Sequence, residues 1–450
     1  MARQWARRGF LSGMATALGG AAAAQEPRER APGQETPPIL FIHGSGDSAA
    51  LWIPTIWRFE TNYHSRRRLF AADMRLPTVR RVDAMREPGR SSAEEATAQL
   101  TQEIARVRRA TSIERIVVVT HGRGGNILRN YLRLNPRQRL KAAILCAPPS
   151  HGVIVSDTHM VGSELNGASP FLRQLNTLPG GVPAEVPTFT LASDRMDLWA
   201  QPDGRFLGLP DVDTGITPAS TGLRGATNVV VPGADHIETA SSPEAFAQIW
   251  RIVTGELPPT LGIRPEVRPA LNGKVGGYEG GAPTNIGIAG ARVRIFPVDP
   301  ATGQRTGPEQ HDRTTPATGS WGPFEADPET PYEFELTVRG YPVSHTYRAP
   351  FPRGSDHINL RPWPPSADDP AEGSLVVVTR PRGYFDIGRD RIEIGGQIVQ
   401  GEPNIPHQNT LRATGPSTMQ AMPVLYNAER IVARTWPIAE RRMTVIELSE

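Results

Sequence analysis

Side chains that can move protons follow several of the chain's most apolar runs. His43, Asp194 and His236 each lie in the turn that follows a short apolar run. An imidazole acts as general base and acid, and a carboxylate that accepts its second N–H orients it and stabilises its charged form. Such a pair usually serves an attacking hydroxyl or thiol. A tight, glycine-rich turn follows residues 116–119, and its Gly122 offers no attacking atom.

The stretch 116–129 predicts a strand, a tight turn and a helix. Residues 116–119 are four consecutive aliphatic residues, as in a strand buried on both faces. After the glycine-rich corner 122–125, apolar side chains return at helical spacing at Ile127, Leu128 and Tyr131. Glycine suits the strained backbone of such a corner, so the fold does not require a side chain at position 122.

Further strands and helices alternate along the first half of the chain. Ser92 and Ser242 are predicted N-caps of the two clearest helices. This alternation predicts an α/β fold with a mostly parallel sheet and helices on both faces, whose strands end at one common edge. Residues 157–178 are too long for a plain connection and are expected to form a cap beside that edge. The predicted strands are 39–42, 68–72, 116–119, 141–147, 186–192 and 228–232, and the helices are 91–109 and 243–254.

The pattern changes after residue 257. Short β-type runs separated by Gly, Pro and Asp turns predict one or two small all-β domains, of sandwich or barrel type. The expected runs are 291–296, 332–338, 374–379, 391–398 and 443–448, and the expected domains are a signal peptide (1–24), a lead-in (25–36), an α/β domain (37–257), a β-sandwich-like domain (258–363) and a second β-unit (372–450).

Composition excludes several classes of function. Among 450 residues, 49 Lys and Arg nearly balance 46 Asp and Glu, so the net charge of +3 does not favour a nucleic-acid partner. Cys146 is the only cysteine, so no intramolecular disulfide forms. His357 and Asp356 lack metal-ligand spacing, and the corner 122–125 does not match a dinucleotide or phosphate loop. We expect neither a metal nor a cofactor.

The N-terminus predicts export. Arg7 and Arg8 precede a mildly apolar run over residues 14–24, which ends in small residues suited to cleavage after Ala24. This resembles a twin-arginine signal, which implies a periplasmic or extracellular protein. The run is too short and too rich in Gly and Ala for a membrane anchor, and no later stretch is long enough to span a bilayer.

Over residues 37–255 the motifs resemble secreted α/β-hydrolases of the lipase and carboxylesterase type. That family's nucleophile elbow reads G-x-S-x-G. Here Thr120 stands at the first glycine, Gly122 at the serine and Gly124 at the last glycine. The later motifs follow in the family's order. The tail, in residues 290–341, resembles a carboxypeptidase-regulatory-like sandwich module, and its position is similar to that of the β-barrel tail of an archaeal lipase.

The resemblance implies a role for each site residue. His236 would be general base and acid, and Asp194 would orient it, with Asp197 and Asp203 as the alternatives. Asp235 is expected to be structural, since sequence neighbours rarely face each other correctly. The oxyanion hole would use the backbone N–H groups of Ser45 and Arg123, which a change at Gly122 leaves intact.

The missing nucleophile leaves two hypotheses open. The protein is an ester hydrolase for small-molecule or lipid esters, weak or inactive because of Gly122, or it is a non-catalytic binding protein in hydrolase form, as neuroligins are. Ser150 is a remote substitute nucleophile, and direct attack by water with His236 as base would be slow. An aromatic group after the first strand either lines an acyl pocket or packs the core; it comprises Trp52, Trp57, Phe59 and Tyr63.

Overall fold

The structure is a computed structural model that describes residues 36–137, 140–177, 181–182, 185–367, 369–401 and 404–449. The predicted twin-arginine signal (1–24), and all of the lead-in except Thr36, lie outside the described residues.

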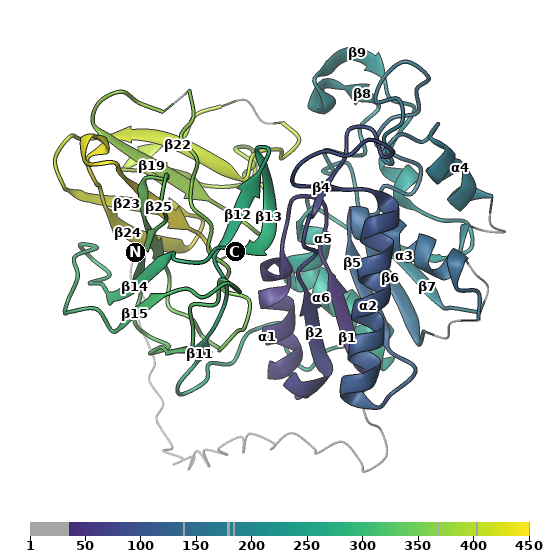
Figure 1. Cartoon of the computed structure of the whole chain (residues 1–450), viewed down its shortest axis with the longest axis horizontal. Coiled ribbons are helices and arrows are strands. Elements are labelled where there is room, and N and C mark those ends of the chain that lie inside the picture. Colours follow the sequence, from purple (N-terminus) through teal and green to yellow (C-terminus); the bar gives the residue numbers. More distant parts are fainter. Residues whose placement is uncertain are drawn as a thin grey trace, which may run out of the picture. The chain divides into compact units, whose positions relative to one another are not determined.

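A six-stranded parallel sheet forms the centre of the first half of the chain (Figure 1, purple to teal). Its order is β10-β7-β6-β5-β1-β2, and every neighbouring pair runs parallel. This confirms the predicted α/β class. The strands are β1 (Ile39–Ile42), β2 (Leu69–Ala72), β5 (Val117–His121), β6 (Ala142–Cys146), β7 (Thr188–Ser193) and β10 (Thr227–Val231).

Helices cover both faces of this sheet because successive strand residues point to opposite sides. Val117 and Val119 of β5 pack into one core cluster with Phe59 of α1 and Trp250 of α6. Val118 packs into the other, which includes side chains of α2 and α3. The helices are α1 (Ile53–Thr61), α2 (Ala93–Thr111), α3 (Arg123–Leu134), α4 (Pro170–Asn176), α5 (Glu238–Ser241) and α6 (Pro243–Thr254).

Helix α2 begins with the predicted capping box. The Ser92 hydroxyl accepts a hydrogen bond from the Glu95 N–H, and the Glu95 carboxylate accepts one from the Ser92 N–H. Helix α6 has its predicted bounds and its predicted cap, Ser242. Both helices are therefore fixed by local sequence as well as by packing.

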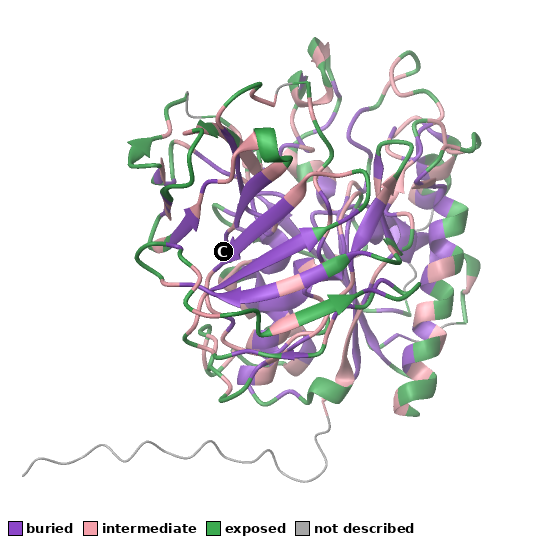
Figure 2. Ribbon diagram, turned by 60° about the vertical axis from the view of Figure 1, so that its left-hand side comes forward, coloured by how far each residue is buried: buried purple, intermediate pink, exposed green. Residues whose placement is uncertain are grey.

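The second half of the chain is all-β (Figure 1, green to yellow). Its main sheet has seven strands in the order β15-β14-β17-β18-β25-β19-β22, and β25 runs parallel to both its neighbours. Strands from both expected β-units, 258–363 and 372–450, therefore belong to one sheet. Its central strands are mostly buried and its edge strands more exposed, as Figure 2 shows. Its strands are β14 (Arg292–Pro297), β15 (His311–Thr314), β17 (Tyr332–Thr337), β18 (Val343–Arg348), β19 (Ser374–Thr379), β22 (Thr410–Gly415) and β25 (Arg442–Glu447).

Smaller sheets complete the structure. A four-stranded sheet has the order β21-β20-β23-β24, and the other four are strand pairs. The bounds are β20 (Ile392–Ile394), β21 (Gln397–Ile398), β23 (Ala421–Tyr426), β24 (Glu429–Arg434), β3 (Thr78–Val79), β4 (Arg90–Ser91), β8 (Asp203–Gly204), β9 (Leu209–Asp213), β11 (Ala270–Leu271), β16 (Phe324–Glu325), β12 (Gly276–Glu279) and β13 (Ala282–Gly287).

The α/β region and the β region share a core. Ile53 and Trp57 of α1 belong to the same hydrophobic cluster as Val293 and Phe334 of the seven-stranded sheet. The Trp57 indole N–H also donates to the Gly354 carbonyl at 2.8 Å. The β region is thus packed against the α/β region by apolar and polar contacts together. Among the described residues, no helix has both the length and the apolar character needed to cross a membrane.

Candidate active site

Gly122 occupies the sharp corner between β5 and α3. Its φ of 49° and ψ of −122° lie where a residue with a side chain is strained. Its N–H donates to the Cys146 carbonyl at 2.9 Å, which fastens the corner to the end of β6. The predicted strand–turn–helix unit is therefore present, with glycine at its apex.

His236 lies above this corner, in the turn between β10 and α5. Its Nδ1 is 2.9 Å from Oδ1 of Asp197, and both side chains are buried. A carboxylate only accepts hydrogen bonds, so Nδ1 is the protonated nitrogen and Nε2 of the neutral ring holds the free lone pair. A β-carbon built on Gly122 would lie 3.3 Å from that Nε2. The imidazole therefore presents its basic nitrogen to the place where a side chain at position 122 would begin.

The carboxylate at His236 is that of Asp197, not the expected Asp194. Asp194 instead accepts hydrogen bonds from the Gly233 N–H at 2.9 Å and the Met196 N–H at 3.2 Å. The first residue after β7 faces the neighbouring turn after β10, and three more residues are needed to reach the imidazole. Asp203, the other alternative, has its side chain half exposed on β8 and bonds to the Arg205 N–H.

Asp235 has structural contacts, in line with the expectation. Its Oδ1 accepts from the N–H groups of Ile237 and Glu238, and its Oδ2 accepts from the Tyr384 N–H at 2.6 Å. Burial and the charge of Glu238 raise the pKa of Asp235 to about 7, against the lowering effect of Arg380. This carboxylate therefore connects the His236 turn to the β region.

Ser45 and Arg123, the expected oxyanion residues, line one cavity with Gly122 and His236. Arg123 is the first residue of α3, and the first N–H groups of a helix have no partner within the helix. The Ser45 hydroxyl accepts from the Val79 N–H at 3.2 Å. The structure thus brings these two residues together with His236, whereas the hydroxyl of Ser150 is buried elsewhere and donates to the Thr221 carbonyl.

The Arg123 side chain forms a buried ion pair. Its Nε and Nη2 lie 2.6 and 2.7 Å from the two carboxylate oxygens of Glu164, which is 1% exposed. Glu164 belongs to the segment 157–178 that was expected to cap the site, and its neighbour Leu165 lines the cavity. The Arg123–Glu164 ion pair therefore holds this part of the segment next to the corner at Gly122.

Two further histidines near the corner are buried. His121 Nε2 lies 3.0 Å from the His236 carbonyl oxygen, and the two rings are 4.7 Å apart. Burial and the neighbouring His236 hold the pKa of His121 well below its usual range. Burial lowers the pKa of His43, whose Nε2 accepts from the Met74 N–H at 3.0 Å. Both rings are therefore neutral supports of the corner.

The site cavity has a volume of about 480 Å³, within the range of small-molecule sites. The predicted aromatic group does not line it: Trp52, Trp57 and Phe59 are core residues and Tyr63 is exposed. The aromatic lining comes from Trp199, and from Trp363 and Tyr384 of the β region. The residues that the β region contributes are Arg361, Trp363, Thr379, Pro381, Tyr384, Asn409 and Thr410.

Two family profiles match the chain. Residues 37–176 match the profile described as the alpha/beta hydrolase fold, and residues 269–365 match the lipase C-terminal domain. The chain is a lipase-like α/β-hydrolase. No curated protein matches it significantly.

Several solved structures are similar at low identity. The mature lipase BlEst2 of Bacillus licheniformis is 16% identical, with 50% of this chain and 95% of that one covered and a TM-score of 0.37. Its propeptide form is 13% identical, with coverages of 91% and 94% and the same TM-score. Phospholipase PlaB of Legionella pneumophila is 10% identical, with coverages of 91% and 92% and a TM-score of 0.34. Likenesses this distant add nothing to the profile matches.

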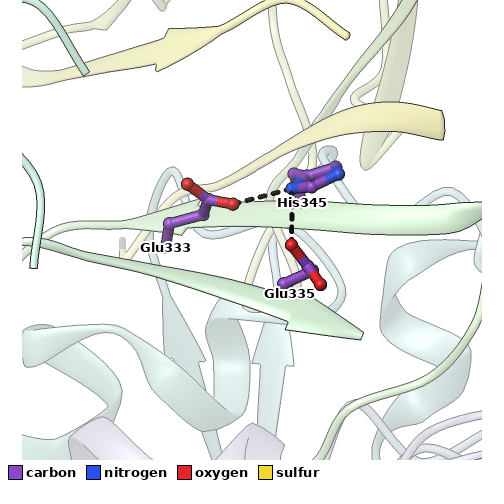
Figure 3. A group of neighbouring side chains, drawn as sticks. All are labelled: Glu333, Glu335 and His345. Carbon is purple, nitrogen blue, oxygen red and sulfur yellow. Dashed lines mark hydrogen bonds and ion pairs between the residues drawn. The ribbon is translucent and has the colours of Figure 1, made fainter. Parts of the chain in front are cut away.

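The β region of this α/β-hydrolase also has a buried polar cluster that the sequence did not predict. Glu333 and Glu335 of β17 and His345 of β18 place one ligand atom each within 4.8 Å of one another, a spacing that suits a metal ion (Figure 3). However, Arg305 pairs with both carboxylates and Arg294 pairs with Glu335. The oxygens thus already neutralise two guanidinium groups, and a cation would have to compete with both.

Proposed function

We propose that the protein is built as a lipase or carboxylesterase for carboxylic esters, and that its activity is weak or absent because Gly122 replaces the nucleophilic serine. The observation that supports this most is the 3.3 Å distance from a β-carbon at position 122 to His236 Nε2. With Asp197 on the other ring nitrogen, the base is oriented for a hydroxyl at that position.

With serine at position 122, His236 would take the hydroxyl proton while the oxygen attacks the ester carbonyl. The proton would then pass to the leaving alcohol, and water would release the acyl group by the same steps. The N–H groups of Ser45 and Arg123 would stabilise the oxyanion. With glycine, the remaining route is attack by a water activated by His236, which lacks the covalent intermediate and should be slower by several orders of magnitude.

The alternative is a non-catalytic protein that binds an ester or a related ligand in the same cavity. Gly122 directly favours this alternative, because glycine has no nucleophilic side chain. The contribution of the β region to the cavity wall also favours it, because the two regions together enclose a ligand-sized space. The polar groups needed for catalysis favour the first proposal, since a binding site has no chemical need for an oriented base.

We further propose that the substrate or ligand is a small-molecule or lipid ester, without nucleic-acid partners, and that the protein is exported through its twin-arginine signal. Changing Arg7 and Arg8 to Lys should prevent export. Undiminished accumulation outside the cytoplasm would contradict the signal.

The test compares the wild type with Gly122→Ser in p-nitrophenyl ester hydrolysis and in labelling by a fluorophosphonate probe. Gly122→Ala is the matched control, because it adds the same β-carbon and backbone strain without an oxygen. We expect turnover and labelling with serine alone, and their loss in Gly122→Ser/His236→Ala. Comparable turnover by the wild type that depends on His236 would contradict the nucleophile argument. A serine variant that folds, but neither labels nor turns over, would favour the binding protein.

A further inference from the structure

A second, larger cavity has a different lining from the His236 cavity. Its volume is about 750 Å³, and among the described residues none lines both cavities. It is bounded by α1, the turn after β10, the ends of β18 and β25, and the segment 380–390. It therefore lies at the junction of the α/β region and the β region, a usual place for ligand sites.

Arg382 is a buried cation of this cavity with few partners. Its side chain is 9% exposed, and its nearest carboxylate oxygen, on Glu447, is 3.9 Å away. Its one hydrogen bond among the described residues goes from Nη1 to the Leu448 carbonyl at 3.3 Å, and Nε has none. A guanidinium has five N–H donors, and a buried charge without a close counter-charge is costly. Burial lowers the pKa of Arg382, which is the direction expected for a poorly compensated cation.

The neighbouring residue, Arg348, adds a second positive charge beside Arg382. It pairs with the same Glu447 carboxylate through Nη2, and its Nε also has no hydrogen-bond partner in the described part of the chain. Two buried guanidinium groups thus share one carboxylate. Of the cavity's other acidic residues, Glu238 bonds to Arg380 and Arg389, Asp390 bonds to Arg389, and Glu244 is exposed to solvent. The corner at Arg382 therefore has one positive charge more than its carboxylate neutralises.

Part of the lining of this cavity is apolar. Trp57 of α1 and Phe351 after β18 line the same cavity, together with Pro54, Ile263, Pro350 and Pro352. A ligand that fits both parts has one negative head group and a hydrocarbon body. A carboxylate matches the planar fork of a guanidinium and carries the single charge that this corner lacks.

We propose that this cavity binds an aliphatic carboxylate, with its head group on Arg382 and its chain along Trp57 and Phe351. The proposal does not depend on whether the Gly122 form hydrolyses esters. Such an acid could be one released by ester hydrolysis or one taken from solution, and both would bind through the same contacts.

The test is calorimetric titration of the whole protein with sodium decanoate below its micelle concentration. We expect saturable binding with one site, and at least about tenfold weaker binding in Arg382→Gln, since a buried charge pair is lost. Arg339→Gln is the matched control, because Arg339 is an exposed arginine of the same region. Trp363 lines the His236 cavity but not this one, so Trp363→Ala should bind decanoate as the wild type does.

A second readout separates binding from misfolding. Without ligand, Arg382→Gln should melt no lower than the wild type, because it removes a poorly compensated buried charge. Decanoate should raise the melting temperature of the wild type and not that of the variant. Equal binding by Arg382→Gln, loss of binding in Trp363→Ala, equally tight binding of 1-decanol, or no saturable binding would each overturn the proposal.

Discussion

The backbone N–H of Tyr384 donates a 2.6 Å hydrogen bond to Oδ2 of Asp235, the residue that precedes His236. Arg380 Nη1 approaches the same oxygen at 3.4 Å, and its Nη2 bonds to Glu238 at 2.6 Å. Both donors come from the segment after β19, so the β region holds the turn that carries the imidazole. The α/β region alone would therefore lack part of the support of its own site.

Asp197 is expected to matter far more than Asp194. In a Gly122→Ser background, Asp197→Asn should lower kcat by about 10³–10⁴-fold, because the amide N–H₂ can donate to Nδ1 and favour the wrong tautomer, and because the imidazolium loses its counter-charge. Asp194→Asn keeps one acceptor oxygen for the turn at Gly233, so its effect should stay below about tenfold. Steady-state kinetics on a p-nitrophenyl ester measures both. Equal losses of kcat in the two variants would mean that Asp194 also acts in the site.

Arg380 is expected to be a positioning residue for the His236 turn. Arg380→Gln should lower the free energy of unfolding by about 3 kcal/mol, since it leaves the buried Asp235 without a counter-charge and Glu238 with Arg389 alone. It should also raise the pKa of Asp235 beyond its value of about 7, because the cation that lowers it is gone.

The pH profile separates this role from mere loss of stability. In a Gly122→Ser background, Arg380→Gln should lose more activity near pH 6 than near pH 8.5, since protonated Asp235 accepts fewer hydrogen bonds. Arg380→Lys should restore part of the activity. A uniform loss at every pH, with no rescue by lysine, would show a structural role alone.

Glu333 is expected to make the protein sensitive to acid. Burial raises its pKa, but hydrogen bonds from Arg305 and His345 outweigh this and lower the pKa from 4.5 to about 2. A depressed carboxyl pKa stabilises the fold above the unfolded value and loses that effect as the pH falls through the folded value. The contribution at neutral pH is about 3 kcal/mol.

In urea unfolding, Glu333→Gln should therefore have a much lower free energy of unfolding than the wild type at neutral pH. This difference should become smaller as the pH falls from about 4.5 toward 2. Glu329→Gln is the control, since that side chain is an exposed carboxylate of the same region. A deficit that does not change over this range would mean that the carboxylate's charge is not the cause.

The buried pair of Arg123 and Glu164 is expected to be strongly coupled. Arg123→Met or Glu164→Leu alone leaves an unpaired buried charge and should cost about 3–5 kcal/mol, whereas the double variant should cost much less. Chemical denaturation of the four proteins of this cycle measures the coupling. Additive losses would mean that the two side chains act independently.

The sequence predicted what local pattern determines. The run 116–119, the corner at Gly122 and the caps of α2 and α6 all rest on residues close in the chain, and the structure has them. The choice between Asp194 and Asp197 depends on the path of the loop after β7, which the local pattern does not encode. Trp363 and Tyr384 reach the site cavity only because the β region packs against α1, a long-range contact with no local signal.

The position of β25 determines when the seven-stranded sheet can be completed during translation. This strand lies between β18 and β19 and runs parallel to both, although β19 ends at Thr379 and β25 begins at Arg442. While the ribosome is still translating the residues between them, β18 and β19 each keep an unpaired edge, which is open to wrong pairing. The α/β region can be complete by then, but the seven-stranded sheet of the region that contributes to the site cavity is complete only after residue 447 has emerged.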